Sequence, residues 1–317
     1  MMDLTYSNLQ KFKDCRKKFY WRVMRRLGTK APSENLFIGS LVHKGLEVLN
    51  LKGNTLIAID EVWKDMDAQL LAAGKFPNSQ EDMDMVTGLK YKLEAMITAY
   101  FDRYQDQDAF GTTDGLAEFK FNLDFNNPKG NKVRLFRVAG KMDRVRVIDN
   151  QLWLYEYKSA SKVPEVNLLK LMLDFQVTLY LWALRKMMPE RQIAGVKYRY
   201  LKKTAIRKGQ AEPMQSYRDR LIAAYRDPDM MIERIVYRSN EELDALEREL
   251  FEISRDLMSC MKSDQWYKNT SQCTGWGGCE YLPLCTASKE TLDDVIKAMF
   301  KEEKINIELE DGNGDNT

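Results

Sequence analysis

The chain has 317 residues, of which 44% are hydrophobic and 30% are charged. This composition is that of an ordinary globular protein with one large domain or two small ones, and it excludes a fibrous or wholly disordered chain. No apolar run reaches the roughly 18–20 residues of a membrane span, and the N-terminus lacks the apolar stretch of a secretory signal. We therefore expect a cytoplasmic protein with no membrane partner. The 49 basic and 47 acidic residues give a net charge of +2, which excludes a globally polybasic protein but allows a local basic groove.

The pattern of apolar residues changes along the chain from helical to strand-like and back. Residues 1–30 read as a basic helix with Ser7 as a plausible N-cap, since its hydroxyl can accept a hydrogen bond from a free backbone N–H. The elements that follow are, in chain order, helices over 36–52, 56–74 and 81–104, strands over 116–125, 133–148 and 151–158, a helix over 168–188, a strand over 194–201, a helix over 216–226, a strand over 232–237, a helix over 240–262 and a loop over 273–285. This order indicates an α/β fold.

Two of the predicted strands form a hairpin that brings carboxylates together. Asp149 and Asn150 suit a two-residue turn, because both residue types tolerate the backbone of such a turn. Counting back along both strands from this turn places Asp143 opposite Glu156, at the end of an otherwise apolar face. Lys158 follows two residues later and therefore shares that face.

Two acidic residues placed opposite each other are unfavourable, and burial raises the cost further. A divalent cation removes both penalties, and carboxylate oxygens suit a hard ion such as Mg²⁺ or Mn²⁺. Lys158 could then stabilise negative charge on a phosphate or position a water molecule. The alternative is a surface hairpin whose carboxylates pair with Lys141, Arg144 or Lys158.

His43 and Glu118 are further candidates for the same site. His43 is the only histidine and lies in an apolar helical segment, so it is either a hydrogen-bonded core residue or a metal ligand. Glu118 lies in an alternating strand and is a weaker candidate ligand, with a solvated surface position as the alternative.

Four short motifs now match a known family. The chain resembles the RecB-like branch of the PD-(D/E)XK nuclease superfamily, and most closely its iron–sulfur members, which are the AddB-type nuclease domain and the CRISPR-associated RecB-like exonucleases. The resemblance covers most of residues 4–286 and begins with the opening LTYSNLQKFKDCRKKFYWRV. The motifs are GxxxH at Gly39–His43, GxxD at Gly140–Asp143, (D/E)xK at Glu156–Lys158 and QxxxY at Gln176–Tyr180.

The resemblance implies a function for each of these motif residues. His43, Asp143, Glu156 and the carbonyl of Tyr157 would bind Mg²⁺ or Mn²⁺, and Lys158 would be the catalytic lysine beside Asp143 and Glu156. Gln176 and Tyr180 would contact DNA or brace the active site, with helix packing as the alternative. The implied organisation is a helical N-terminal section over 1–110, a nuclease core with a mixed sheet flanked by helices over 111–262, a C-terminal cysteine clip over 263–301 and a disordered acidic tail over 302–317.

A second site is expected at the cysteines. Cys273, Cys279 and Cys285 lie in the glycine-rich segment CTGWGGCEYLPLC. In the iron–sulfur members one cysteine near the N-terminus completes such a set, and Cys15 stands at that position. Together the four would hold a [4Fe–4S] cluster, with Zn²⁺ or unligated thiols as alternatives. Both gaps between the C-terminal cysteines are five residues long, which departs from the spacing in the family. Cys260 is expected to be a packing residue.

Basic residues gather in two segments, 11–30 and 197–208. We expect them to neutralise phosphates of DNA, and single out as contacts Arg16, Lys17, Lys202 and Lys203. The aromatic residues between them are expected to be core residues more often than base-stacking ones.

These observations predict a metal-dependent DNA nuclease. We expect an exonuclease on single strands or DNA ends, in bacterial or phage DNA processing, repair or recombination, with a helicase or recombination protein as a possible partner. The sequence has no GxxxxGK[ST] motif of its own to support an NTP-driven motor. The alternatives are an endonuclease, a trimming subunit of a larger complex, or a non-catalytic iron–sulfur module that binds DNA ends.

Overall fold

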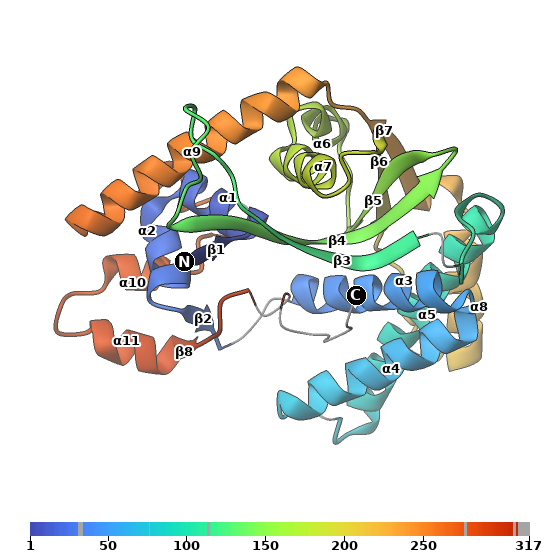
Figure 1. Ribbon diagram of the computed structural model, residues 1–317. Coiled ribbons are helices and arrows are strands. Elements are labelled where there is room, and N and C mark those ends of the chain that lie inside the picture. Colours follow the sequence, from blue (N-terminus) through green and yellow to red (C-terminus); the bar gives the residue numbers. More distant parts are fainter. Residues whose placement is uncertain (31–33, 76, 113–114, 276–277, 307–308, 310–317) are drawn as a thin grey trace.

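A mixed sheet runs through the middle of the molecule and carries helices on both faces (Figure 1). The computed structural model describes residues 1–30, 34–75, 77–112, 115–275, 278–306 and 309. Within these ranges the sheet has six strands, with the bounds β1 Met2–Leu4, β3 Gly115–Leu123, β4 Phe136–Ile148, β5 Gln151–Ala160, β6 Gln192–Lys202 and β7 Met231–Val236. Their order is β1-β4-β5-β6-β7, with β3 also paired to β4. The β1–β4 and β5–β6 pairs are parallel and the other pairs are antiparallel, which confirms the predicted mixed α/β sheet.

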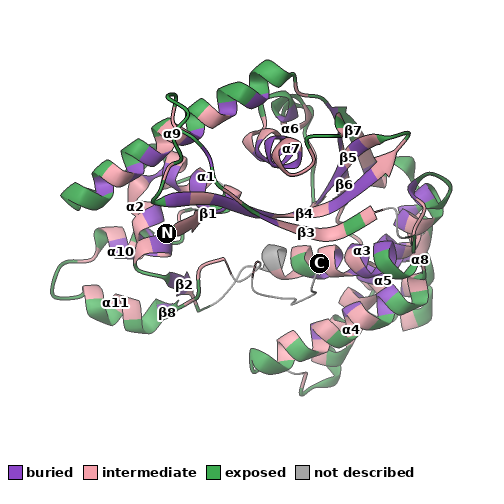
Figure 2. Ribbon diagram, viewed as in Figure 1, coloured by how far each residue is buried: buried purple, intermediate pink, exposed green. Residues whose placement is uncertain are grey.

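The helices form a layer on each face of this sheet (Figure 1). One layer consists of α1 Tyr6–Asp14, α7 Phe175–Met187 and α9 Asn240–Ser263. The other consists of α3 Glu34–Lys52, α4 Thr55–Ala72, α5 Gln80–Asp108 and α8 Met214–Tyr225. Figure 2 shows the buried positions on the sides of these helices that face the sheet. Among the described residues no helix is long and apolar enough to cross a membrane.

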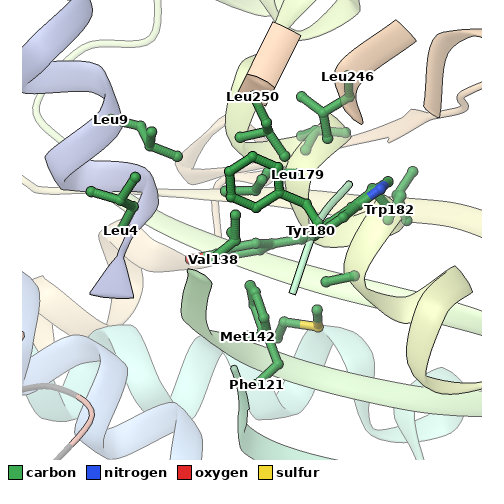
Figure 3. Close-up of a cluster of buried hydrophobic side chains, with 14 of the residues drawn as sticks. Leu4, Leu9, Phe121, Val138, Met142, Leu179, Tyr180, Trp182, Leu246 and Leu250 are labelled. Carbon is green, nitrogen blue, oxygen red and sulfur yellow. The ribbon is translucent and has the colours of Figure 1, made fainter. Parts of the chain in front are cut away.

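Each layer has its own hydrophobic core. The cluster that we call the α7 core packs α1, α7 and α9 against the sheet, and Figure 3 shows part of it around Leu179, Tyr180 and Met142. The cluster that we call the α3 core lies on the opposite face and includes Tyr155 and Tyr157 of β5. Because β5 contributes residues to both cores, the polar groups at its end lie between two rigid layers.

The predicted hairpin between β4 and β5 is confirmed. Asp149 and Asn150 form the turn with backbone φ angles of 50° and 62°, as a two-residue turn of this kind requires. The pairing runs from Ile148 with Gln151 to Arg144 with Tyr155, in the predicted register.

The predicted basic helix over 1–30 is wrong as a single element. The segment contains β1, α1, the short helix α2 Arg16–Phe19, a π-turn over Tyr20–Met24 and the strand β2 Leu27–Thr29. The predicted N-cap is also wrong, because the hydroxyl of Thr5 accepts from the backbone of Asn8 and α1 begins before Ser7. The helix breaks at Cys15, whose backbone is extended, and Asn269 binds the freed carbonyl of Asp14 at 2.8 Å.

Two other regions also differ from the sequence prediction. The predicted helix over 168–188 is divided at Asp174, whose side chain accepts from the backbone of Val177 and starts α7; before it lie α6 Glu165–Lys170 and a 3₁₀ turn over Leu171–Leu173. The C-terminal region has elements that the sequence did not predict, namely α10 Leu282–Thr286, α11 Leu292–Met299 and the strand β8 Phe300–Glu302.

The strand β8 pairs with β2 and so joins the two ends of the described chain. A disordered tail was predicted from residue 302 onwards. In its described part, Glu303 is ion-paired with Arg22 at 2.8 Å and Asn306 binds Asn8 at 2.8 Å, so this part packs on the N-terminal segment. Residues 307–308 and 310–317 lie outside the described residues.

Candidate metal centre and catalytic site

Three elements supply the predicted catalytic residues. His43 comes from α3, Asp143 from β4, and Glu156 and Lys158 from β5. Gly140 allows the packing that supports them, because a Cβ atom at this position would lie 2.6 Å from the ring of Phe121. The sequence motifs, which lie far apart along the chain, therefore meet where the pairing of β4 with β5 ends.

Asp143 is the centre of this arrangement. Its Oδ1 lies 3.1 Å from Nδ1 of His43, and its Oδ2 accepts a hydrogen bond of 2.8 Å from the backbone N–H of Tyr157. Burial raises the pKa of Asp143, but His43, Lys158 and the Tyr157 N–H outweigh it, so the pKa lies below its ordinary value. Burial likewise lowers the pKa of His43, and the charge of Asp143 reverses this shift and raises it.

Asp143 lies at a break in the pairing of β4. On one edge of this strand, β1 pairs with residues 136–138 and β5 with residues 144–148, so the described ladders leave Asp143 unpaired there. On the other edge β3 pairs on both sides of Asp143 but not at it. Met142 and Val145 both pack into the α7 core, so the alternation of side chains is interrupted between them. The break turns Asp143 towards α3, and it is the reason that the predicted direct pairing of the two carboxylate residues is not formed.

Glu156 is buried and incompletely hydrogen-bonded. Its Oε1 accepts from Lys158 at 2.5 Å and from Gln176 at 2.9 Å, whereas its Oε2 is buried without a hydrogen-bond partner. Burial, and then the charge of Asp143, raise the pKa of Glu156 to about 7. A carboxylate oxygen in this state is expensive to bury and is ready to accept a cation.

Lys158 stays charged in this environment. Burial lowers the pKa of Lys158, but the charges of Glu156 and Asp143 act more strongly together and raise it above its ordinary value. The ammonium group is therefore a fixed positive charge next to the carboxylates.

Glu118 is a site residue that the sequence ranked too low. His43, Asp143 and Glu118 each place one ligand atom so that all three atoms lie within 4.8 Å of one another, and no other such set of histidine, cysteine or acidic residues occurs in the described part of the chain. The carboxylate of Glu118 is also ion-paired with Lys141. The sequence could have indicated Glu118 through its position opposite Asp143 in the β3–β4 pair. That position can be recognised only when the register between these two strands is known.

Gln176 and Tyr180 brace the site. Both are buried, and Gln176 holds Glu156 through the hydrogen bond described above. The ring of Tyr180 meets that of Phe121 edge to face at 5.8 Å and adjoins Gly140. Of the two roles implied by the resemblance, these contacts fit bracing of the active site.

The donor set suits a hard divalent ion. In an octahedral site with bonds of about 2.1 Å, adjacent ligand atoms lie roughly 3.0 Å apart, and the His43–Asp143 distance of 3.1 Å agrees with this value. The unpartnered Oε2 of Glu156 is a further oxygen on the neighbouring strand, and its side chain would have to move to share the ion, since Glu156 does not form a set with His43 and Asp143 within 4.8 Å. The side chain of Tyr157 lies on the face of β5 opposite to that of Glu156 and is buried in the α3 core near Asn50. Only the backbone of Tyr157 is therefore close to the site.

The cysteines of the predicted clip lie in one region without forming a tight set. Asn269 links two of them, since its backbone N–H donates to Sγ of Cys15 at 3.3 Å and its carbonyl lies 4.0 Å from Sγ of Cys273. Cys279 and Cys285 pack against a small core around Trp21. No three sulfur atoms of the described cysteines lie within 4.8 Å of one another. Cys260 is buried in the α7 core, as expected for a packing residue.

The basic residues singled out from the sequence divide into two groups. Arg16 lies near the rings of Phe12 and Tyr267 and is 3.5 Å from Asp256, and Lys17 lies over the rings of Tyr20 and Trp21. Both residues therefore lie beside the cysteine region, directly after Cys15. Lys202 is the last residue of β6, and Lys203 follows it.

Within the second basic segment, Lys202 is paired with Ala160 of β5, and the backbone of Lys203 donates to Ala160 at 2.8 Å. The prediction that segment 197–208 forms a basic surface is wrong for Arg199, because this residue is buried and ion-paired with Asp108 and Glu233.

Comparison with known proteins agrees with this geometry. A family model described as the PD-(D/E)XK nuclease superfamily matches residues 3–286. No curated protein matches the chain. Several solved structures match it, and two of them, each at 14% identity, are a candidate exonuclease from Eubacterium rectale, with 80% of each chain covered and a TM-score of 0.45, and SSO0001, with 72% of this chain and 78% of the other covered and a TM-score of 0.29. At these TM-scores neither structure adds to the assignment. The family match spans most of the chain and all four motifs, and the chain belongs to the PD-(D/E)XK nuclease superfamily.

Proposed function

We propose that the protein is a metal-dependent deoxyribonuclease that removes nucleotides from single strands or DNA ends. The observation that carries the proposal is the buried, unpartnered oxygen of Glu156 beside the His43–Asp143 pair. A buried carboxylate with an unused oxygen is unstable unless a cation completes it. The two acidic residues and the histidine would hold Mg²⁺ or Mn²⁺, and the nitrogen ligand makes Mn²⁺ a reasonable choice.

The residues around the ion would each contribute to cleavage. When bound, the ion supplies positive charge to the phosphate and lowers the pKa of a water molecule. The raised pKa of Lys158 keeps its ammonium group charged, so it orients the phosphate and stabilises the negative charge that develops there. Gln176 fixes the rotamer of Glu156 and thereby aims its second oxygen.

DNA would reach this site along the end of β5 and β6. Lys202 and Lys203 lie next to Ala160, two residues beyond Lys158, so their charges are well placed for phosphates of the bound strand. Arg16 and Lys17, which lie beside the cysteine region, would add further positive charge for the bound DNA.

The test is a nuclease assay with end-labelled linear DNA and circular single-stranded DNA, with and without a chelator. We expect cleavage of linear DNA, loss of cleavage with the chelator, and no cutting of the circle. Cutting of the circle would show endonucleolytic action instead. Asp143→Ala and Lys158→Ala should each abolish cleavage while binding of DNA is retained.

A matched control for these variants is Lys132→Ala, because Lys132 lies in an exposed ion pair with Asp124 at 2.6 Å. This variant should keep full activity. If Asp143→Ala or Lys158→Ala cleaves as fast as the control, the assigned site is rejected. DNA binding without cleavage by the unaltered protein under all metal conditions would favour a non-catalytic end-binding module.

We also propose that Cys15, Cys273, Cys279 and Cys285 hold a [4Fe–4S] cluster. The contacts through Asn269 support the proposal, because they bring the N-terminal and C-terminal cysteines into one region. A single zinc ion with bonds of about 2.3 Å would need all of its sulfur ligands roughly 3.8 Å apart, and no three sulfur atoms of the described cysteines lie within 4.8 Å of one another. A four-iron cluster holds its thiolates farther apart, which suits this arrangement better.

Metal analysis and visible absorption of anaerobically purified protein test the second proposal. We expect about four irons per chain and the brown colour of an iron–sulfur protein. The variant Cys15→Ser should lose this colour, whereas Cys260→Ser should keep it because Cys260 lies in the α7 core. A colourless protein with stoichiometric zinc would refute the cluster.

A further inference from the structure

Glu118 has a backbone conformation that is unusual for a strand. It lies within β3 at a φ angle of 51°, although it is not a glycine. Its neighbours Ala117 and Phe119 pair normally with β4, so the distortion is confined to one residue. A left-handed residue other than glycine is energetically unfavourable, and it persists only where the surroundings impose it.

The distorted position lies across from Asp143 and joins the metal centre. The carboxylate of Glu118 has an oxygen within 4.8 Å of ligand atoms of both His43 and Asp143. In an octahedral site with bonds of about 2.1 Å, opposite ligand atoms are roughly 4.2 Å apart. A small movement of the Glu118 side chain would therefore bring all three ligand atoms onto one ion.

A cation of the protein itself now holds this carboxylate. The ammonium group of Lys141 is ion-paired with Glu118, and the charges of Glu47 and Asp143 also act on it. Lys141 thus lies among three acidic residues, in the surroundings that a divalent ion would otherwise neutralise.

An independent observation shows that the site lacks a positive charge even with both lysines in place. The Oε2 atom of Glu156 remains buried without a partner, although Lys158 and Gln176 occupy its Oε1. The side chain of Glu156 is only 3% exposed, so bulk solvent does not reach it. The centre is therefore built to receive a cation beyond those that the chain supplies.

We propose that Glu118 is an additional metal ligand. Until the divalent ion binds, its carboxylate stays ion-paired with the ammonium group of Lys141. The incoming ion displaces the ammonium group of Lys141 from Glu118, and the released group then faces a phosphate of the DNA. This inference rests on the metal-dependent function proposed above and adds to it a ligand and an exchange of partners.

Binding of Mn²⁺ to the protein without DNA, measured by isothermal titration calorimetry, tests the exchange. Glu118→Gln should weaken Mn²⁺ binding at least tenfold, as loss of a ligand does. Lys141→Met should tighten it several-fold, because the competing ammonium group is gone. Lys141→Arg keeps the positive charge and should bind Mn²⁺ no more tightly than the unaltered protein.

The double variant Glu118→Gln, Lys141→Met separates competition from a merely structural role. Once Glu118 cannot bind a cation, removal of the Lys141 charge should no longer tighten Mn²⁺ binding. Lys132→Met, at the exposed pair with Asp124, is the matched control and should leave Mn²⁺ binding unchanged. The inference is overturned if Lys141→Met weakens Mn²⁺ binding or leaves it unchanged, or if Glu118→Gln binds as well as the unaltered protein.

The same titration of Asp143→Asn keeps the two proposals apart. If Asp143→Asn loses Mn²⁺ binding and Glu118→Gln does not, the metal centre stands and only the role of Glu118 is wrong. If Asp143→Asn also binds Mn²⁺ normally, the metal centre itself is wrong.

Discussion

Two buried charged clusters draw on neighbouring residues of β4, and they differ in how their charges are neutralised. Consecutive residues supply them, since Asp143 enters the metal centre and Arg144 enters the other cluster. There Arg144 and Arg199 lie with Asp108, and Arg199 also pairs with Glu233 at 2.6 Å. Two basic and two acidic groups match, and Arg144, Arg199 and Asp108 are at most 2% exposed.

The metal centre has no such match. Three carboxylates, those of Glu118, Asp143 and Glu156, face the two ammonium groups of Lys141 and Lys158. One carboxylate oxygen stays unpartnered. A neutral buried cluster joins α5 to the sheet, whereas a cluster with excess negative charge gains stability when a cation arrives. The comparison teaches that charge balance, and not burial alone, separates a structural ionic cluster from a binding site.

The largest effect is expected from breaking the neutral cluster. Asp108→Ala leaves the buried Arg144 without a carboxylate and Arg199 with Glu233 alone, and it should lower the free energy of unfolding by about 3–5 kcal/mol. Denaturant unfolding measures this change. The exposed counterpart Asp124→Ala should cost no more than about 1 kcal/mol. Equal losses in the two variants would contradict the structural role of the buried cluster.

The second effect concerns the residue that holds Glu156 in place. Gln176→Leu removes the hydrogen bond to Oε1 of Glu156 and should weaken Mn²⁺ binding by about 10–100-fold. The control is Gln69→Leu, which removes a comparable amide bond of 2.9 Å to Asp65 on the surface of α4. Unchanged Mn²⁺ binding by Gln176→Leu would mean that Glu156 does not need this brace.

The third effect is a dependence of metal binding on pH. The pKa of Glu156 is raised to about 7 in the metal-free protein, so below this pH a proton competes with the ion. The raised pKa of His43 acts in the same direction. Calorimetry should show Mn²⁺ affinity at least roughly tenfold lower at pH 6 than at pH 8. An affinity independent of pH would show that Glu156 is not a ligand.

Stability of the metal-free protein should follow the same titration with the opposite sense. The folded protein holds the Glu156 proton more tightly than the unfolded chain, whose carboxyl group has the ordinary pKa of 4.5. The free energy of unfolding should therefore fall as the pH rises from 4.5 to about 7. Thermal unfolding with a chelator measures this slope, and Glu156→Gln should reduce it.

The smallest effect is expected on stability at the metal centre. Asp143→Asn loses the charge that pairs with His43 but also relieves its repulsion with Glu118 and Glu156, so in the metal-free protein it should change the free energy of unfolding by less than about 1 kcal/mol. The unaltered protein should gain stability on addition of Mn²⁺, and this variant should not. If Asp143→Asn lowered the free energy of unfolding as much as Asp108→Ala, the metal centre would stabilise the metal-free fold in the same way as the neutral cluster.

Much of the catalytic site could be predicted because its signals are local. The turn at Asp149–Asn150 fixes the register of β4 and β5, and short motifs mark His43, Asp143 and Lys158. Such patterns depend on a few neighbouring residues and survive in the folded protein. The same reasoning gave the order of most helices and strands.

The rest depends on contacts between distant segments. Glu118 belongs to the metal centre only because β3 is distorted opposite Asp143, and a periodic pattern cannot show a single left-handed residue. The break at Cys15 is stabilised by Asn269, which lies far away in the sequence. The extra strands β1, β2 and β8 are three residues long, too short for any alternation to be visible.

The pairing of β2 with β8 has a consequence for how the protein is made. About 270 residues separate the two strands, so β2 has no partner until the last helices have been synthesised. At roughly 5–20 residues per second, this delay lasts roughly 15–60 s on the ribosome. During that time β2, at the end of the basic and aromatic segment 11–30, lacks its partner strand, and pairing of the two chain ends is a late event in biosynthesis. A premature stop codon before Phe300 would therefore leave β2 permanently without its partner strand.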